Sequence, residues 1–276
     1  MFEGPEVRTL TRQAEQELVG RRITLSSVSP TRPRFLSVSP DPLAFSEQLT
    51  GRTIQRITCT GKSLRTHLDT EAILVIGETG GRFQLHAHSD TLPKKIHWQM
   101  ALDDGRCLTL TIQMWGFLAL MTEEELASHP YLGSDGPDPM DPGFSVEMLE
   151  EAIRTRQLEK NDPIKEFLIH GPNIAGIGNG YLQDILFRAR LSPKRKLADL
   201  TDRDVGRLHE AIVETLSGAV QAGGRDTELD LYGEPGSYVP LLDRRQAGAP
   251  CPACGEPIQK TQYLGGACYL CPVCQT

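Results

Sequence analysis

The chain has 276 residues, of which 39% are hydrophobic and 24% charged, and its formal net charge is −7. This is the composition of a globular protein, and no apolar run reaches the ~18 residues that a membrane-spanning helix needs. The first residues include Glu3 and Glu6 and lack the apolar stretch of a signal peptide, so we expect a cytoplasmic protein. The acidic balance argues mildly against nucleic acid as a partner but does not exclude it, because a local cluster of positive charge can bind DNA.

The first half of the chain is predicted to form one helix followed by strands. Residues 5–19 have apolar side chains at helical spacing, Pro5 suits the first helical position, and Gly20 ends the element. From 22 to 120, short segments rich in β-branched residues alternate with Gly, Pro and Asp, which is typical of a sandwich or barrel. We therefore predict a β-sandwich domain at 1–122.

The rest of the chain divides into three further segments. Within the β-rich part, "ITCTGKSLRTHL" is predicted to be a hairpin with Gly61 and Lys62 at its turn. The range 123–144 is rich in Pro, Gly and Asp and is predicted to be a linker. Helical periodicity then dominates, which predicts a helical domain at 145–248. The last segment, 249–276, is too short for a hydrophobic core of its own and needs a covalent or metal staple.

Four cysteines in that last segment are spaced as metal ligands. Cys251 and Cys254 form one Cys-x-x-Cys pair, and Cys271 and Cys274 form a second. Each pair can present two thiolates to one tetrahedral ion, so the spacing predicts one structural zinc ion per chain and favours it over a redox pair. Cys268 falls outside this pairing and is predicted to be a small buried hydrophobe.

A glycine-rich stretch precedes a predicted helix in "PNIAGIGNGYLQDILFRARL". Gly176, Gly178 and Gly180 allow backbone N–H groups to approach an anion, and Asn179 can donate its side-chain amide to the same phosphate. The densest basic cluster follows at 194–196. Taken alone, such a turn is more often structural, and a basic run is usually solvated surface.

Together these segments resemble the formamidopyrimidine-DNA glycosylase and endonuclease VIII family. "EGPEVRTL" is similar to the family's N-terminal motif, "TGKSLRTHL" to its hairpin lysine motif, and "HPYLGSDGPDPMDP" to its interdomain linker. "NIAGIGNGYLQDILF" resembles its helix–two-turn–helix signature, and the four cysteines match its zinc finger. The resemblance implies an α+β, multi-domain fold: an N-terminal helix plus β-sandwich, a helix–two-turn–helix domain and a C-terminal zinc finger.

The resemblance also implies a function in base-excision DNA repair. The expected partner is double-stranded DNA containing a damaged base or an abasic site, held between the two lobes of a monomer, with no membrane partner. The chain is then expected in the cytoplasm and associated with the nucleoid when it is on DNA. Family members remove damaged bases and cut the strand, using an N-terminal proline that attacks C1′ and forms an imine; the base is flipped out of the duplex.

Specific residues carry over from the family motifs. Glu3 matches the glutamate that moves protons. Lys62 and Asn179 match two residues that contact phosphates of the damaged strand, and Lys165 aligns with a further basic position. Trp115 is expected to wedge into the base stack.

The sequence departs from the family at the nucleophile, because Phe2 stands where the proline is expected. Three candidates follow: the terminal amine of a chain that retains Met1, the amine of Phe2 after Met1 is removed, and the side-chain amine of Lys62. Hydrolysis by water that Glu3 activates, without a covalent intermediate, is a further possibility.

Other positions also differ. Gly266 replaces a finger arginine that grips phosphate, which predicts weaker DNA binding by about 1–3 kcal/mol. Glu78 and Gln113 stand where many relatives have methionine and arginine. Two interpretations follow: a divergent DNA glycosylase or abasic-site lyase, and a non-catalytic protein that binds lesions or abasic sites. A scaffold that has lost DNA binding is a third. The sequence does not indicate which lesion is preferred.

Overall fold

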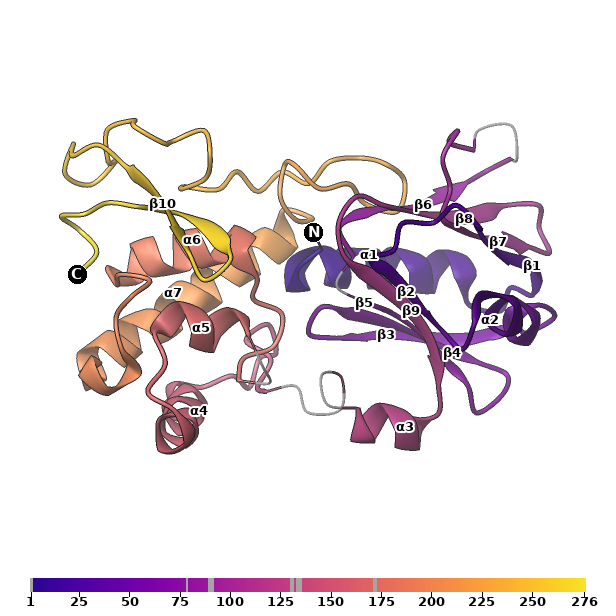
Figure 1. Ribbon diagram of the computed structural model, residues 1–276, viewed down its shortest axis with the longest axis horizontal. Helices are drawn as coiled ribbons and strands as arrows, with labels where there is room; N and C mark the ends of the chain where they lie inside the picture. Colours follow the sequence, from indigo (N-terminus) through magenta and orange to yellow (C-terminus); the bar gives the residue numbers. More distant parts are fainter. Residues whose placement is uncertain (1, 78, 89–91, 130–131, 133–135, 171–172) are drawn as a thin grey trace. The chain divides into compact units, whose positions relative to one another are not determined.

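The computed structural model describes residues 2–77, 79–88, 92–129, 132, 136–170 and 173–276 (Figure 1). The chain divides into two compact units, one formed by Met1–Ser134 with Ala222–Ser237, the other by Asp135–Gln221 with Tyr238–Thr276. The segment Ala222–Ser237, which lies within the range predicted for the helical domain, therefore packs with the first unit. Met1, Glu78 and part of the predicted linker lie outside the described residues.

The first unit contains three helices and nine strands among its described residues. In chain order these are α1 (Gly4–Leu18), β1 (Ile23–Val28), β2 (Leu36–Ser39), α2 (Pro42–Leu49), β3 (Ile54–Thr60), β4 (Ser63–Leu68), β5 (Ile73–Gly77), β6 (Gly81–His86), β7 (Trp98–Leu102), β8 (Cys107–Ile112), β9 (Gly116–Met121) and α3 (Glu123–Ser128).

The strands form two sheets, which confirms the predicted β-sandwich. One sheet has the order β1-β7-β8-β6 and the other β2-β9-β5-β4-β3. All neighbouring strands are antiparallel except β2 and β9, which run parallel. Both sheets contribute to one hydrophobic core, for example through Ile57, Trp98 and Leu118. The indole Nε1 of Trp98 donates to Ser26 Oγ at 3.0 Å, so this polar atom is satisfied inside the core.

Helix α1 forms where the sequence predicts it. Pro5 lies in its first turn, and the carboxylate of Glu6 accepts a hydrogen bond from the backbone N–H of Glu3, the N-cap residue. Its apolar residues, including Leu10 and Leu18, are buried in the same core as the sheets. The first residues of the chain are thus fixed to the sandwich by the packing of the helix that follows them.

Strands β3 and β4 form the predicted hairpin. Thr60 pairs with Ser63, so the turn consists of Gly61 and Lys62. Gly61 has φ +56°, a conformation that glycine adopts without the strain a Cβ brings. The turn fixes the backbone of Lys62 at the end of the sheet.

The second unit is helical and carries a two-stranded hairpin. Its elements are α4 (Val146–Glu159), α5 (Ile164–Ile169), α6 (Asn179–Ala189), the short 3₁₀ helix η2 (Leu197–Asp199), α7 (Asp202–Gln221), β10 (Gln259–Tyr263) and β11 (Gly266–Leu270). The helices share one core. A smaller cluster buries Leu242 and Ile258 with two of the cysteines.

Helix α6 begins directly after the glycine-rich stretch, with Gly178 as its N-cap. Asp184, fully buried on this helix, accepts hydrogen bonds from the backbone N–H groups of Leu241 and Leu242 at 2.9 Å and from the hydroxyl of Tyr238 at 2.7 Å. These bonds attach the segment leading to the cysteine hairpin to the helical core. Among the described residues, no helix is both long and apolar enough to cross a membrane.

Candidate functional site

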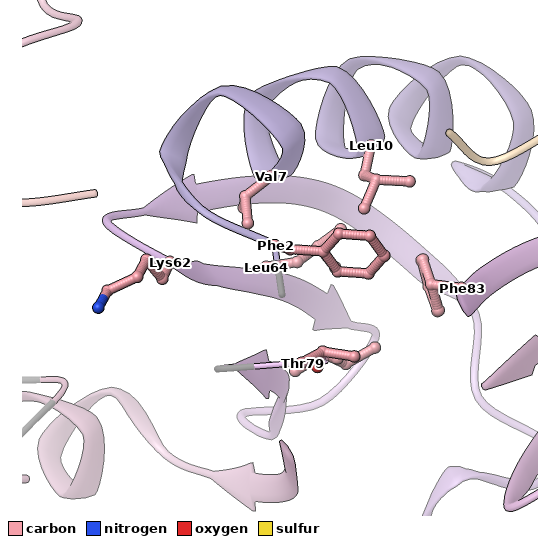
Figure 2. Close-up of a pocket in the computed structure, with 8 residues that line it drawn as sticks. Phe2, Val7, Leu10, Lys62, Leu64, Thr79 and Phe83 are labelled. Carbon is pink, nitrogen blue, oxygen red and sulfur yellow. The ribbon is translucent and has the colours of Figure 1, made fainter. Parts of the chain in front are cut away.

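The side chain of Phe2 fills an apolar pocket beneath α1. Phe2 is only 3% exposed. Figure 2 shows its ring below the helix, and the pocket is lined by Phe2, Val7, Leu10, Lys62, Leu64, Ile76, Thr79 and Phe83. The remaining cavity is about 20 Å³, which is room for about one water molecule. The aromatic residue at the expected nucleophile position is therefore part of the hydrophobic core.

The backbone nitrogen of Phe2 is also held in place. It donates a hydrogen bond to the carbonyl oxygen of Thr79 at 2.9 Å. Because this nitrogen is a donor to the pocket wall and its side chain is buried beside it, residue 2 is fixed at two points.

Lys62 lies at the same pocket. It is half-buried, its stem lines the pocket, and its amine points away from the ring of Phe2 (Figure 2). The structure thus brings together Phe2 and Lys62, two of the three residues for which the sequence predicts a catalytic role, and the third, Glu3, directly follows Phe2 in the chain.

Glu3 belongs to a buried charged cluster that also contains Glu6 and Arg225. All three residues are at most 8% exposed. The guanidinium of Arg225 lies 3.3 Å from Glu3 Oε1 through Nη1, and it bonds both carboxylate oxygens of Glu6 through Nε (3.1 Å) and Nη2 (3.3 Å). Buried carboxylates need such partners, because an uncompensated buried charge is costly.

The role of Arg225 was not predicted from the sequence. Arg225 lies 222 residues from Glu3, within "AGGRDTELDLYG". Two glycines precede this arginine and several acidic residues follow it, and the segment has no hydrophobic periodicity that would predict burial. The preceding Gly224 has φ +98°, and a Cβ on it would lie 2.9 Å from Glu6 Cγ. The glycine therefore permits the close approach of this segment to α1, which is the one local sign of the contact.

Trp115 lies at the turn between β8 and β9 and is 64% exposed. Its ring contacts that of Phe35 edge to face, with 6.5 Å between centroids. Its neighbours Met114, which is 54% exposed, and Gln113 are exposed as well. The turn therefore presents an aromatic side chain, supported on one side, to solvent.

In the second unit, Lys165 and Asn179 both meet the cysteine hairpin. Lys165 is fully buried, and its Nζ donates to the carbonyl oxygen of Tyr263 at 2.6 Å and lies 3.4 Å from Cys268 Sγ. The Nδ2 of Asn179 donates to the carbonyl oxygen of Ala267 at 3.1 Å. A Cβ on Gly266 would lie 3.3 Å from both Lys165 Nζ and Asn179 Oδ1. The ammonium of Lys165 thus occupies the space beside the glycine.

The four cysteines of the hairpin converge on one point. Their sulfur atoms all lie within 4.8 Å of one another, with 3.5 Å between Cys254 and Cys271 and 3.9 Å between Cys251 and Cys274. A tetrahedral ion bound at about 2.3 Å to each sulfur needs sulfurs about 3.8 Å apart, so the cluster has the dimensions of a metal site.

Electrostatics in the cluster favour a thiolate at Cys271. Burial raises the pKa of its thiol, but the backbone N–H groups of Cys274 and Val273 and the neighbouring thiols lower it more, so that the pKa falls to about 7. The pKa of Cys274 rises to about 12, chiefly because of its contact with Cys254. Deprotonated sulfur is the form that binds metal.

Taken together, these features define a class of protein with a helix-capped β-sandwich and a helical unit that carries a four-cysteine hairpin. The formamidopyrimidine-DNA glycosylase N-terminal domain model matches residues 1–113, and the H2TH domain model of the same enzymes matches residues 136–230. A formamidopyrimidine-DNA glycosylase from Geobacillus kaustophilus is 32% identical over the full length of both chains, and one from Desulforamulus reducens is 34% identical, covering 100% of this chain and 99% of its own.

Solved structures agree with the sequence comparisons. MutM in complex with DNA containing carbocyclic 8-oxo-G has a TM-score of 0.84 at 26% identity, and Lactococcus lactis Fpg with DNA containing an abasic site has a TM-score of 0.84 at 27% identity. Both comparisons cover 99% of each chain. The chain therefore belongs to the formamidopyrimidine-DNA glycosylase family.

Proposed function

We propose that this chain is a DNA repair protein that binds duplex DNA containing a damaged base or an abasic site and acts as a base-excision DNA glycosylase and abasic-site lyase. The names of its relatives and the DNA in the related structures support this substrate class. One observation carries the enzymatic part of the proposal. The first residues of the chain and Lys62 meet at one pocket, and Glu3 directly follows the residue that fills it.

Lys62 is the nucleophile in this proposal. The nitrogen of Phe2 is engaged with Thr79, and the bulky ring beside it is buried, so an attack from residue 2 requires both contacts to break. Lys62 lies at the turn between β3 and β4, and its amine points away from the pocket (Figure 2). A primary amine on a flexible stem suits imine chemistry.

At an abasic site, the Lys62 amine adds to the C1′ aldehyde carbon, and loss of one water molecule from the adduct gives an imine. Removal of a proton from C2′ then sends an electron pair toward C3′, and the C3′–O bond breaks with its pair on the departing phosphate. At a damaged base, the amine forms a bond to C1′ while the glycosidic bond breaks. The electron pair of the glycosidic bond leaves with the base, which takes up a proton. Glu3 is proposed to carry these protons.

DNA contacts are proposed for both units. Lys62 supplies an amine suited to phosphate, and Asn179 supplies the second N–H of its Nδ2, since the first donates to Ala267. The exposed ring of Trp115 suits stacking in the space of a flipped base. Lys165 adds a positive charge beside Asn179. Because its Nζ is bonded to Tyr263, we propose that Lys165 acts on DNA chiefly by setting the position of the hairpin and by its charge.

Zn²⁺ is the ion proposed for Cys251, Cys254, Cys271 and Cys274. The sulfur spacing and the lowered pKa of Cys271 support it. When bound, the ion crosslinks the two ends of a hairpin that has little core of its own. The four side chains then hold β10 and β11 in register against Lys165 and Asn179.

A non-catalytic lesion-binding protein is the second candidate. The observation that favours it is Phe2 itself, whose burial removes the N-terminal nucleophile that the family resemblance implies. In this alternative the protein still binds damaged DNA, but it forms no imine with it.

Incubation with abasic-site duplex and borohydride separates the two candidates. Wild-type protein should form a covalent adduct, because borohydride reduces an imine to a stable amine. Lys62→Ala should lose the adduct. It should still bind a tetrahydrofuran-site duplex, which cannot form an imine, but more weakly than wild type because one phosphate contact is lost. Lys94→Ala, another lysine of the first unit, is the matched control and should react as wild type. Binding without any adduct would establish the second candidate.

A further inference from the structure

We propose that Arg225 is a positioning residue for Glu3, and that it sets the orientation of this carboxylate for the reaction. The inference rests on the proposed function. Arg225 and the two glutamates form a group in which one guanidinium serves two buried carboxylates, and its Nη2 also lies 3.7 Å from Glu228 Oε1. The five N–H donors of arginine make such a shared contact possible, whereas a lysine ammonium cannot reproduce its planar fork.

Most of the polar atoms of Arg225 contact Glu6, and one guanidinium nitrogen contacts Glu3. Its backbone N–H donates to Glu6 Oε1 at 3.0 Å, and Nε and Nη2 bond the same carboxylate. Glu6 also accepts from the backbone N–H of Glu3, which locks it to the start of α1. With the guanidinium plane fixed on Glu6, its Nη1 is directed at Glu3 Oε1.

Arg225 is presented by a segment that has its own attachments to α1. Asp230 accepts from Gln13 Nε2 at 2.7 Å, and Gln13 Oε1 accepts from the backbone N–H of Leu231 at 3.0 Å. Leu231 is fully buried in the sandwich core, and the hydroxyl of Tyr232 donates to Glu17 at 2.9 Å.

These attachments involve positions further along α1 and do not use the guanidinium. The backbone of the segment is therefore held whether or not residue 225 is arginine. A group held by contacts other than those it makes to its target is preorganised, which is the property expected of a positioning residue.

The alternative is a purely structural ion pair that fastens the segment to α1. The two roles predict different losses. A structural pair affects folding and binding, whereas a positioning contact affects the rate of the chemical step, because small displacements of a reacting group cost large factors in rate.

The test measures single-turnover reaction with abasic-site duplex and, separately, the Kd for tetrahydrofuran-site duplex, using the full chain. We expect Arg225→Gln to lower the rate by about 100-fold while Kd changes by less than about threefold. Arg225→Lys should restore thermal stability more than rate, since charge returns without the fork. Arg52→Gln changes an exposed arginine of the same unit, outside the cluster, and should leave the rate unchanged.

Each outcome decides the proposal. A folded Arg225→Gln protein that reacts within threefold of wild type overturns it, as does a loss of binding that accounts for the whole loss of rate. If Arg225→Gln is unfolded at the assay temperature, Arg225→Lys serves instead, and a wild-type rate there overturns the inference. A wild-type chain that binds but never reacts overturns the proposed function, and the inference with it.

Discussion

The substitution Phe2→Ala tests whether the start of the chain is part of the core. The ring is 3% exposed and packs among Leu10, Leu64 and Phe83. Truncation of a buried phenylalanine to alanine costs about 3–5 kcal/mol, and we expect about 3 kcal/mol because residue 2, near the chain end, can relax into the space. At 2–4 °C for each kcal/mol, the melting temperature of the first unit should fall by roughly 6–12 °C.

Thermal unfolding followed by circular dichroism without DNA measures this effect. Leu43→Ala is the matched control, because Leu43 is an apolar residue of the same unit that is 69% exposed in α2. Its cost should stay within about 0.5 kcal/mol. If Phe2→Ala lowers the melting temperature no more than Leu43→Ala does, the ring is not packed, and residue 2 is free to move and to present its nitrogen as the nucleophile.

Three further predictions follow from the site. Gly266→Arg should not strengthen DNA binding, and it should destabilise the second unit by about 1–3 kcal/mol because its Cβ meets Lys165 Nζ and Asn179 Oδ1. A smaller loss of stability in a Lys165→Met background would show that the contact with Lys165 is the cause. Equal losses in the two backgrounds would refute this explanation. Trp115→Ala should weaken binding to abasic-site duplex by about 1–3 kcal/mol in a fluorescence titration, with little change in melting temperature, whereas an unchanged Kd would exclude stacking. Zinc affinity should fall more steeply once pH drops below about 7, since protons then compete for the Cys271 thiolate as well as for Cys274. A chelator assay with constant zinc release from pH 8 to pH 6 would contradict this.

Features with a local signal could be predicted from the sequence. The first helix, the hairpin turn at Gly61 and Lys62, the glycine-rich start of α6 and the two cysteine pairs each lie within a short stretch whose residue types determine backbone conformation or ligand spacing. The convergence of the four sulfurs follows from the pairing of β10 with β11, which brings the second cysteine pair back to the first.

Features that depend on distant parts of the chain could not be predicted. The parallel pairing of β2 with β9 and the burial of Phe2 require knowledge of which surfaces meet. Arg225 shows the limit most clearly, because its partners lie more than 200 residues away and the segment that carries it packs with the first unit although it follows the helices of the second. A charged residue in a polar segment is usually solvated, so its burial leaves no trace in composition.

The central claim is that this family member performs imine chemistry through the hairpin lysine although its N-terminal position is occupied by a buried phenylalanine. Proteolysis of the borohydride-trapped complex followed by peptide mapping by mass spectrometry tests it most directly. The account predicts a nucleotide-derived mass on the peptide that contains Lys62, and none on the N-terminal peptide. A modified N-terminal amine, or tight binding with no modified peptide, would contradict it.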